Sequence, residues 1–174
     1  MRCASVRSAT EMEPEPELEP CVPPVDIRVF IAHRGTQAGQ QRAEELREQL
    51  GIPSASCGPI DAVPIDAVVV ALLLCAAEAP FAQIHAEGDS VRMALGQVFA
   101  GGKQVVLPVV DQGFAPAQLE GLPDDIRELS RQLFVPVDWE GGAEAAQSGL
   151  ATLCGCVQHV ARHTISPELR EYLR

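Results

Sequence analysis

Four potential metal ligands lie close together near the C-terminus: Cys154, Cys156, His159 and His163. Cysteine and histidine at such spacings resemble a structural zinc site, which normally collects its ligands from two structural elements. Here the apolar pattern predicts a single helix over residues 143–163. At about 100° per residue, Cys156, His159 and His163 share one side of this helix, and Cys154 lies on the other side. We therefore expect a solvated helix face and no metal site.

The glycines and carboxylates near the predicted strand ends fit none of three common phosphate chemistries. A Walker loop follows a strand and ends in Gly-Lys-Ser/Thr, whereas Gly101-Gly102-Lys103 precedes a strand and lacks the hydroxyl residue. A Rossmann fingerprint needs three spaced glycines, and only Gly35 and Gly39 follow the first strand. A receiver domain needs carboxylates for Mg²⁺ at the ends of its first and third strands. Residues 32–34 and 75–77 supply none.

Composition excludes several classes of partner. The 174 residues carry a net charge of −11 and only 4% aromatic residues. Nucleic acid and anionic membrane surfaces require a basic footprint, and base stacking requires aromatic rings. The longest apolar run, residues 67–77, is about half the length of a membrane-spanning helix. The six cysteines are scattered in a way that predicts reduced thiols and a cytoplasmic location.

Short apolar runs alternate with helical patterns along the chain, which predicts one α/β domain with a doubly wound parallel sheet. The predicted strands cover residues 26–31, 67–75, 104–110 and 133–137, with an optional edge strand at 52–57; the predicted helices cover 37–50, 90–100 and 143–163. The predicted core includes Ile27, Val29, Val69, Leu73, Val106 and Val109. Ligands of such sheets bind at the carboxyl ends of the strands, so function should be sought after Ile31, Cys75 and Val110.

The two ends of the chain differ from its body. Residues 1–24 alternate glutamate with proline and offer little to bury, so we expect a disordered acidic tail; docking of this tail on the body is the alternative. Residues 25–163 form the predicted domain. Ser166-Pro167-Glu168 is a helix-start signature, which predicts a short C-terminal helix within residues 164–174.

Two stretches resemble the Toll/interleukin-1 receptor (TIR) domain family. The first is Val29-Phe-Ile-Ala-His-Arg34-Gly35, similar to the opening strand and loop of that family. The second runs through Gly102-Lys103-Gln-Val-Val-Leu-Pro108, Asp111-Gln-Gly113-Phe114 and Leu122-Pro123-Asp-Asp-Ile126, and is most similar to the TIR enzymes that cleave NAD⁺. Trp139 falls near a tryptophan that is common after that segment.

The resemblance implies a flavodoxin-like fold and a role in intracellular signal transduction, of the innate-immunity type, through association with itself or another TIR domain. It also implies NAD⁺ as the possible substrate or ligand, with no other cofactor. A remnant nucleotide pocket would comprise His33, Arg34, Gly35, Asp111 and Phe114. NAD⁺ glycohydrolase activity is the alternative function, and a truncated fragment without function is a further one.

Two departures from the TIR pattern favour association over catalysis. Counting back from Lys103, the catalytic glutamate of the family falls on Ala94, and the aromatic residue before it falls on Ser90. Glu87 is the nearest candidate for a shifted acid, although charges before a helix commonly complement its dipole. Residues 51–66 are also too short and proline-rich for the usual long loop and helix. We expect this connection to run as an extended cover.

Overall fold

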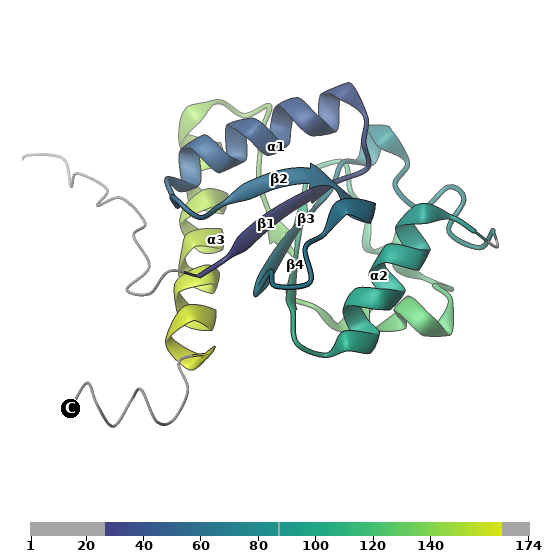
Figure 1. Cartoon of the computed structure of the whole chain (residues 1–174). Helices are drawn as coiled ribbons and strands as arrows, with labels where there is room; N and C mark the ends of the chain where they lie inside the picture. The colour runs from purple at the N-terminus through teal and green to yellow at the C-terminus, as the bar shows by residue number, and fades with distance from the viewer. Residues whose placement is uncertain (1–26, 87, 165–174) are drawn as a thin grey trace, which may run out of the picture.

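Five parallel strands form one sheet in the order β2-β1-β3-β4-β5 (Figure 1). The strands are β1 (Val29–His33), β2 (Ser56–Pro59), β3 (Val69–Leu74), β4 (Val105–Val110) and β5 (Val135–Pro136). The computed structural model describes residues 27–86 and 88–164. In these ranges the chain is a doubly wound, flavodoxin-like α/β domain, as the alternating pattern predicts.

Helices cover both faces of the sheet. Helices α1 (Gln37–Leu50) and α3 (Ala143–Thr164) pack on one face, and α2 (Ser90–Gly101) packs on the other together with the 3₁₀ segment η4 (Asp124–Arg131) (Figure 1). Alternate residues of each strand belong to two different cores. The core beneath α1 and α3 contains Val29, Ile31, Val69, Ala71 and Leu73. The core beneath α2 contains Phe30, Ala32, Val70, Leu72 and Leu74. Short segments η1 (Ile60–Ala62), η2 (Ala76–Glu78) and η3 (Pro116–Leu119) complete the connections.

The predicted core and most element boundaries are confirmed. All six predicted core residues are at most 4% exposed, and β1, β3 and β4 are adjacent and parallel. The helix predicted over residues 37–50 is α1, capped by Thr36 and ended by the left-handed Gly51. The strand bounds differ more from the prediction, and the strand predicted over 67–75 is β3, Val69–Leu74. The first pairs over Val29–His33 instead of 26–31, and the last shrinks from 133–137 to two residues, because it is an edge strand in which Pro136 offers no N–H.

The connection between α1 and β3 contains no α-helix, as its prolines predict. The edge strand forms at Ser56–Pro59 instead of 52–57 and pairs with β1 from Phe30 to His33. The chain then makes the single turn η1, which buries Ile60, and returns along α2 to the start of β3. Consequently α2 packs against an extended segment of this connection. The TIR resemblance would imply a second helix in the same connection.

The C-terminal helix α3 orients its side chains largely as predicted. Leu153, Val157 and Ala161 are buried against the sheet. His159 and His163 are exposed, with ring centroids 4.2 Å apart. Cys156 departs from the prediction, because it is half-buried against the core. Within residues 27–86 and 88–164, no group of three metal-ligating side chains is arranged to hold an ion.

Several predictions concern residues outside the described ranges. The acidic tail (residues 1–24), the signature at Ser166-Pro167-Glu168 and Glu87 belong to this group. The four cysteines in the described part of the chain, Cys57, Cys75, Cys154 and Cys156, form no disulfide there. Among the described helices, none has the length and apolarity needed to cross a membrane.

Candidate functional site

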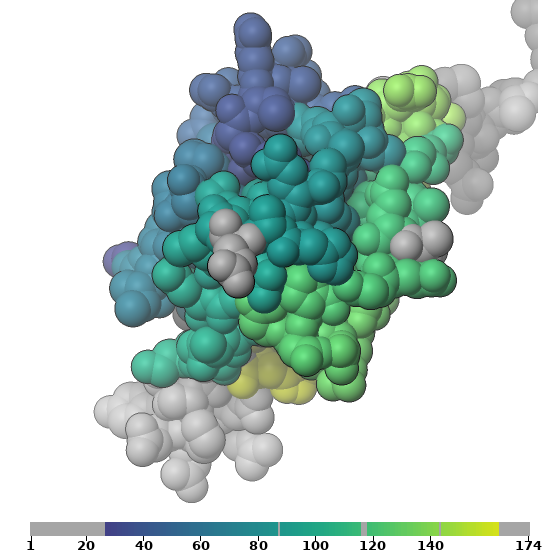
Figure 2. All heavy atoms as spheres, turned by 90° about the vertical axis from the view of Figure 1, so that its right-hand side faces the viewer, coloured from purple at the N-terminus to yellow at the C-terminus, as the bar shows by residue number. Residues whose placement is uncertain are grey.

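Three loops meet where the strands end. In Figure 2 the start of α1 (purple), the segment after β3 (teal) and the segment after β4 (green) lie side by side on one face. Parallel strands bring their carboxyl ends to the same edge of the sheet, which is where ligands of doubly wound folds bind. The predicted residues His33, Arg34, Gly35, Asp111 and Phe114 all belong to these loops or to the strand ends beside them.

Arg34 is held by backbone and carboxylate oxygens of this edge. Its Nη1 donates to the carbonyl oxygen of Ala79 at 2.9 Å and to that of Pro80. Its Nη2 lies 3.9 Å from Oδ2 of Asp89, whose side chain is 6% exposed. Ala79 has a φ of 43°, the left-handed region that non-glycine residues rarely adopt. Arg34 therefore fastens a strained turn after β3 to the N-cap of α2.

His33 is buried and acts as an acceptor. The backbone N–H of Gly35 donates to its Nδ1 at 3.0 Å, so the proton of the neutral ring resides on Nε2. Burial lowers the pKa of His33 below its ordinary value, although the charges of Glu78 and Glu44 oppose this shift. The ring is thus neutral at pH 7 and contributes shape and an acceptor at the strand end.

The lowered pKa of His33 predicts a pH-dependent stability. The unfolded chain binds a proton at His33 from about pH 6.5 downward, whereas the folded chain resists protonation until a lower pH. The free energy of unfolding should therefore fall as pH drops below about 6.5, until the folded pKa is reached. In denaturant titrations from pH 7.5 to 5, His33→Gln should show a flatter profile, and the exposed control His159→Gln should keep the wild-type slope. Equal slopes in all three proteins would contradict this assignment.

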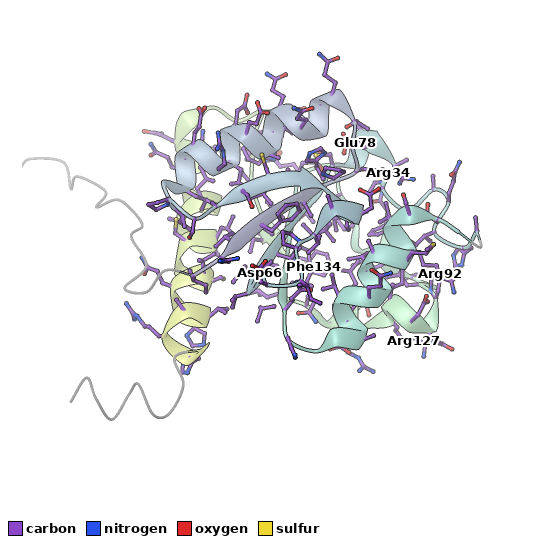
Figure 3. All side chains as sticks on the ribbon, in the orientation of Figure 1. Arg34, Asp66, Glu78, Arg92, Arg127 and Phe134 are labelled. Carbon is purple, nitrogen blue, oxygen red and sulfur yellow. The ribbon has the colours of Figure 1, made fainter. Side chains whose placement is uncertain are left out.

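Thr36 and Glu78 join the start of α1 to the segment after β3. Thr36 Oγ1 accepts from the N–H of Gly39 at 3.0 Å, and its hydroxyl donates to Oε1 of Glu78. Gly39 permits this approach, because a Cβ there would lie 3.1 Å from that same oxygen. Oε2 of Glu78 is buried and has no hydrogen-bond partner within the described ranges. Figure 3 shows Glu78 and Arg34 close together at this edge.

Asp111, the first residue after β4, contacts the segment that follows β3. Both of its carboxylate oxygens accept from the N–H of Ala76 at 3.1 Å, and Oδ2 lies 3.4 Å from Nη1 of Arg42. The same Arg42 nitrogen donates to Sγ of Cys75 at 3.2 Å. Burial raises the pKa of the Cys75 thiol, with Arg42 acting in the opposite direction. The thiol is therefore protonated, and Asp111 supports the turn after β3.

The five predicted residues thus lie at the same edge of the sheet but have different structural roles. His33, Gly35, Arg34 and Asp111 satisfy hydrogen bonds of the chain itself. Phe114 instead lines a separate hollow of about 480 Å³ with Val110, Leu119, Glu120, Ser130 and Phe134. Glu78 was not among the residues predicted from the sequence. Its position three residues after the predicted buried strand 67–75 was the available signal.

A second hollow, of about 330 Å³, lies between α2 and the extended connection. It is lined by Ile60, Asp61, Val63, Ile65, Ala94, Gln97, Val98, Gly101, Lys103 and Gln104. Ala94, which occupies the expected position of the TIR glutamate, contributes only a methyl group to it. Asp61 and Lys103 are the charged residues of this lining. At the start of α2, Asp89 accepts from the N–H of Arg92 at 2.9 Å and serves as the N-cap.

Comparison with known protein families and curated proteins identifies no relative of this chain. The chain matches no protein-family model, and none of the curated proteins matches it in sequence. The likeness to TIR domains therefore rests on the quoted motifs and on a fold that many unrelated functions share. Any function has to be argued from the residues of the two hollows and the polar edge between the strand ends.

Proposed function

We propose that this chain is a TIR-like association module that acts in cytoplasmic signalling by binding a second TIR-like domain, its own copy included, and not by catalysis. The observation that carries the proposal is the exposure of Ile65. This side chain is 96% exposed, although it sits at the rim of the hollow beside α2. Exposed apolar side chains mark an interaction site when several of them form one patch, and Ile65 lines its hollow together with Val63 and Ala94.

The surroundings of Ile65 support an interface. Val63 and Val98 add apolar surface to the same hollow, and the exposed amides of Gln97 and the half-buried Gln104 offer polar contacts at its border. Met93 of α2 is a further exposed apolar side chain, at 55%. An apolar centre with a polar rim is the usual composition of a protein-binding patch. The shortened connection leaves this patch uncovered, since no helix lies over it in the described part of the chain.

The absence of a carboxylate at Ala94 favours association over NAD⁺ cleavage. Cleavage of the nicotinamide bond passes through a cationic transition state that a nearby carboxylate stabilises, as in glycosidases. The methyl group of Ala94 offers no such charge to the hollow it lines. NAD⁺ hydrolysis is accordingly the weaker candidate.

Replacement of Ile65 by serine tests the proposed interface. Because Ile65 is almost fully exposed, Ile65→Ser should fold normally while removing the apolar centre of the patch. In sedimentation velocity over rising concentration, the wild type should self-associate and Ile65→Ser should stay monomeric. Leu133→Ser is the matched control, since Leu133 is also exposed (63%) but lies outside this patch. A wild type that is monomeric at every concentration, or equal weakening by both variants, would contradict the proposal.

A further inference from the structure

A cluster of three phenylalanines forms at the carboxyl edge, away from the patch around Ile65. Phe81, Phe114 and Phe134 are three of the five phenylalanines in the chain. The rings of Phe114 and Phe134 are stacked, with centroids 6.1 Å apart, and Phe81 meets Phe114 edge-on at 6.3 Å. All three are half-buried. The segments that carry them are far apart in sequence, so only the fold assembles this aromatic wall.

The wall borders the hollow of about 480 Å³ described above. This volume lies within the usual range for sites of small molecules, which are apolar with a few placed polar groups. Phe114, Phe134, Leu119 and Val110 supply the apolar lining, and Glu120 and Ser130 supply the polar groups. The hollow opens where β4 ends, at the edge where doubly wound sheets bind their ligands.

Glu120 differs from the other carboxylates of this region. Asp124 pairs with Arg127, Asp125 pairs with Arg92 at 2.9 Å, and Glu128 pairs with Arg131 at 3.3 Å. Figure 3 shows Arg92 and Arg127 on the side of α2 and η4. Within the described ranges, no cation lies within ion-pair distance of the exposed Glu120 carboxylate. The hollow thus combines aromatic side chains with a carboxylate that has no ion-pair partner in the described ranges.

We propose that this hollow binds a small, flat organic cation. Aromatic rings attract cations through the negative charge of their faces, and the Glu120 carboxylate would accept hydrogen bonds from an amidinium, guanidinium or protonated amine. A flat ligand would pack against the side chains of Phe114 and Phe134, which line the hollow. An anion would be disfavoured by Glu120, and a neutral ring would gain only the apolar contacts.

Three probes of one shape test the charge preference. Benzamidine, benzamide and benzoate carry the same ring with charges of plus one, zero and minus one. In NMR titrations of the full chain, benzamidine should bind about fivefold more tightly than benzamide, and benzoate should bind most weakly. The shifted signals should be those of the lining, Phe114 and Phe134 above all. Absence of saturable benzamidine binding, or equal affinity for all three probes, would overturn the proposal.

Matched variants separate the local charge from the overall charge of −11. Glu120→Gln keeps the shape of the side chain and should reduce the preference for benzamidine over benzamide, leaving the part that the aromatic rings contribute. Glu48→Gln, an exposed glutamate of α1 on the opposite face, should leave all three affinities unchanged. Phe114→Leu should weaken benzamidine more than benzamide or benzoate, because it removes both the apolar contact and the attraction of the ring for the cation. An undiminished benzamidine preference in Glu120→Gln, or its loss in Glu48→Gln, would refute the site.

Discussion

Val69→Asp should leave the domain unfolded at room temperature. Val69 is 0% exposed in β3, the central strand, where it pairs in register with Val29 of β1 and Val105 of β4. A carboxylate there would lose its hydration and gain no partner. That penalty of several kcal/mol is comparable with the entire stability of a typical domain, about 5–15 kcal/mol. Far-UV circular dichroism should show no cooperative thermal transition.

A control substitution tests whether the burial of position 69, and not the introduction of a carboxylate as such, causes the unfolding. Ile65→Asp introduces the same charge four residues earlier, at a side chain that is 96% exposed. This variant should melt within a few degrees of the wild type, because the new carboxylate stays hydrated. A Val69→Asp protein with a wild-type melting curve would show that β3 does not lie between two covered faces.

Incubation of the purified chain with NAD⁺ should release no nicotinamide above background. Removing a single group that stabilises developing charge typically costs about 10²–10³ in rate, and Ala94 offers no charge at all to the hollow beside α2. The reaction is followed by chromatography of nicotinamide at high protein concentration. Heat-denatured protein provides the background.

Variants identify the responsible group if release is observed. Loss of release in Glu87→Ala would place the acid before α2, and the proposal of a non-catalytic module would then be wrong. Loss in Glu78→Ala would assign the reaction instead to the carboxylate with the buried, unpartnered oxygen. Gain of release in Ala94→Glu, with an inactive wild type, would show that the hollow beside α2 accepts NAD⁺ and that Asp61 does not replace a carboxylate at position 94.

Local sequence was sufficient for most elements of the fold. The apolar period of residues 37–50, with Thr36 before them and Gly51 after them, places α1 correctly at both ends. The run at residues 67–75 identifies a strand covered on both faces, because all six residues of β3 are buried. The segment η4 was missed: it is a short 3₁₀ helix that buries only Ile126 and Leu129, and so few apolar positions leave little periodicity to detect.

The candidate site was only partly predictable. The predicted strand ends indicated Arg34 and Asp111 as candidates, because the carboxyl ends of parallel strands lie at one edge of the sheet whatever the sequence of the loops. Some of their partners, Ala79 for Arg34 and Ala76 for Asp111, are backbone groups, which residue type does not reveal. Their charged partners, Asp89 and Arg42, lie far away in sequence. Sequence therefore located the edge, and the tertiary structure assigned those side chains to supporting the turn after β3.

The aromatic wall depended on tertiary structure altogether. Phe81, Phe114 and Phe134 lie in three connections, and each taken alone is an ordinary apolar residue of a loop. They meet because strand order and register set where each connection begins. Local propensity and periodicity act over a few residues, within one turn or one strand. Contacts across tens of residues arise only when the packed sheet determines which loops become neighbours.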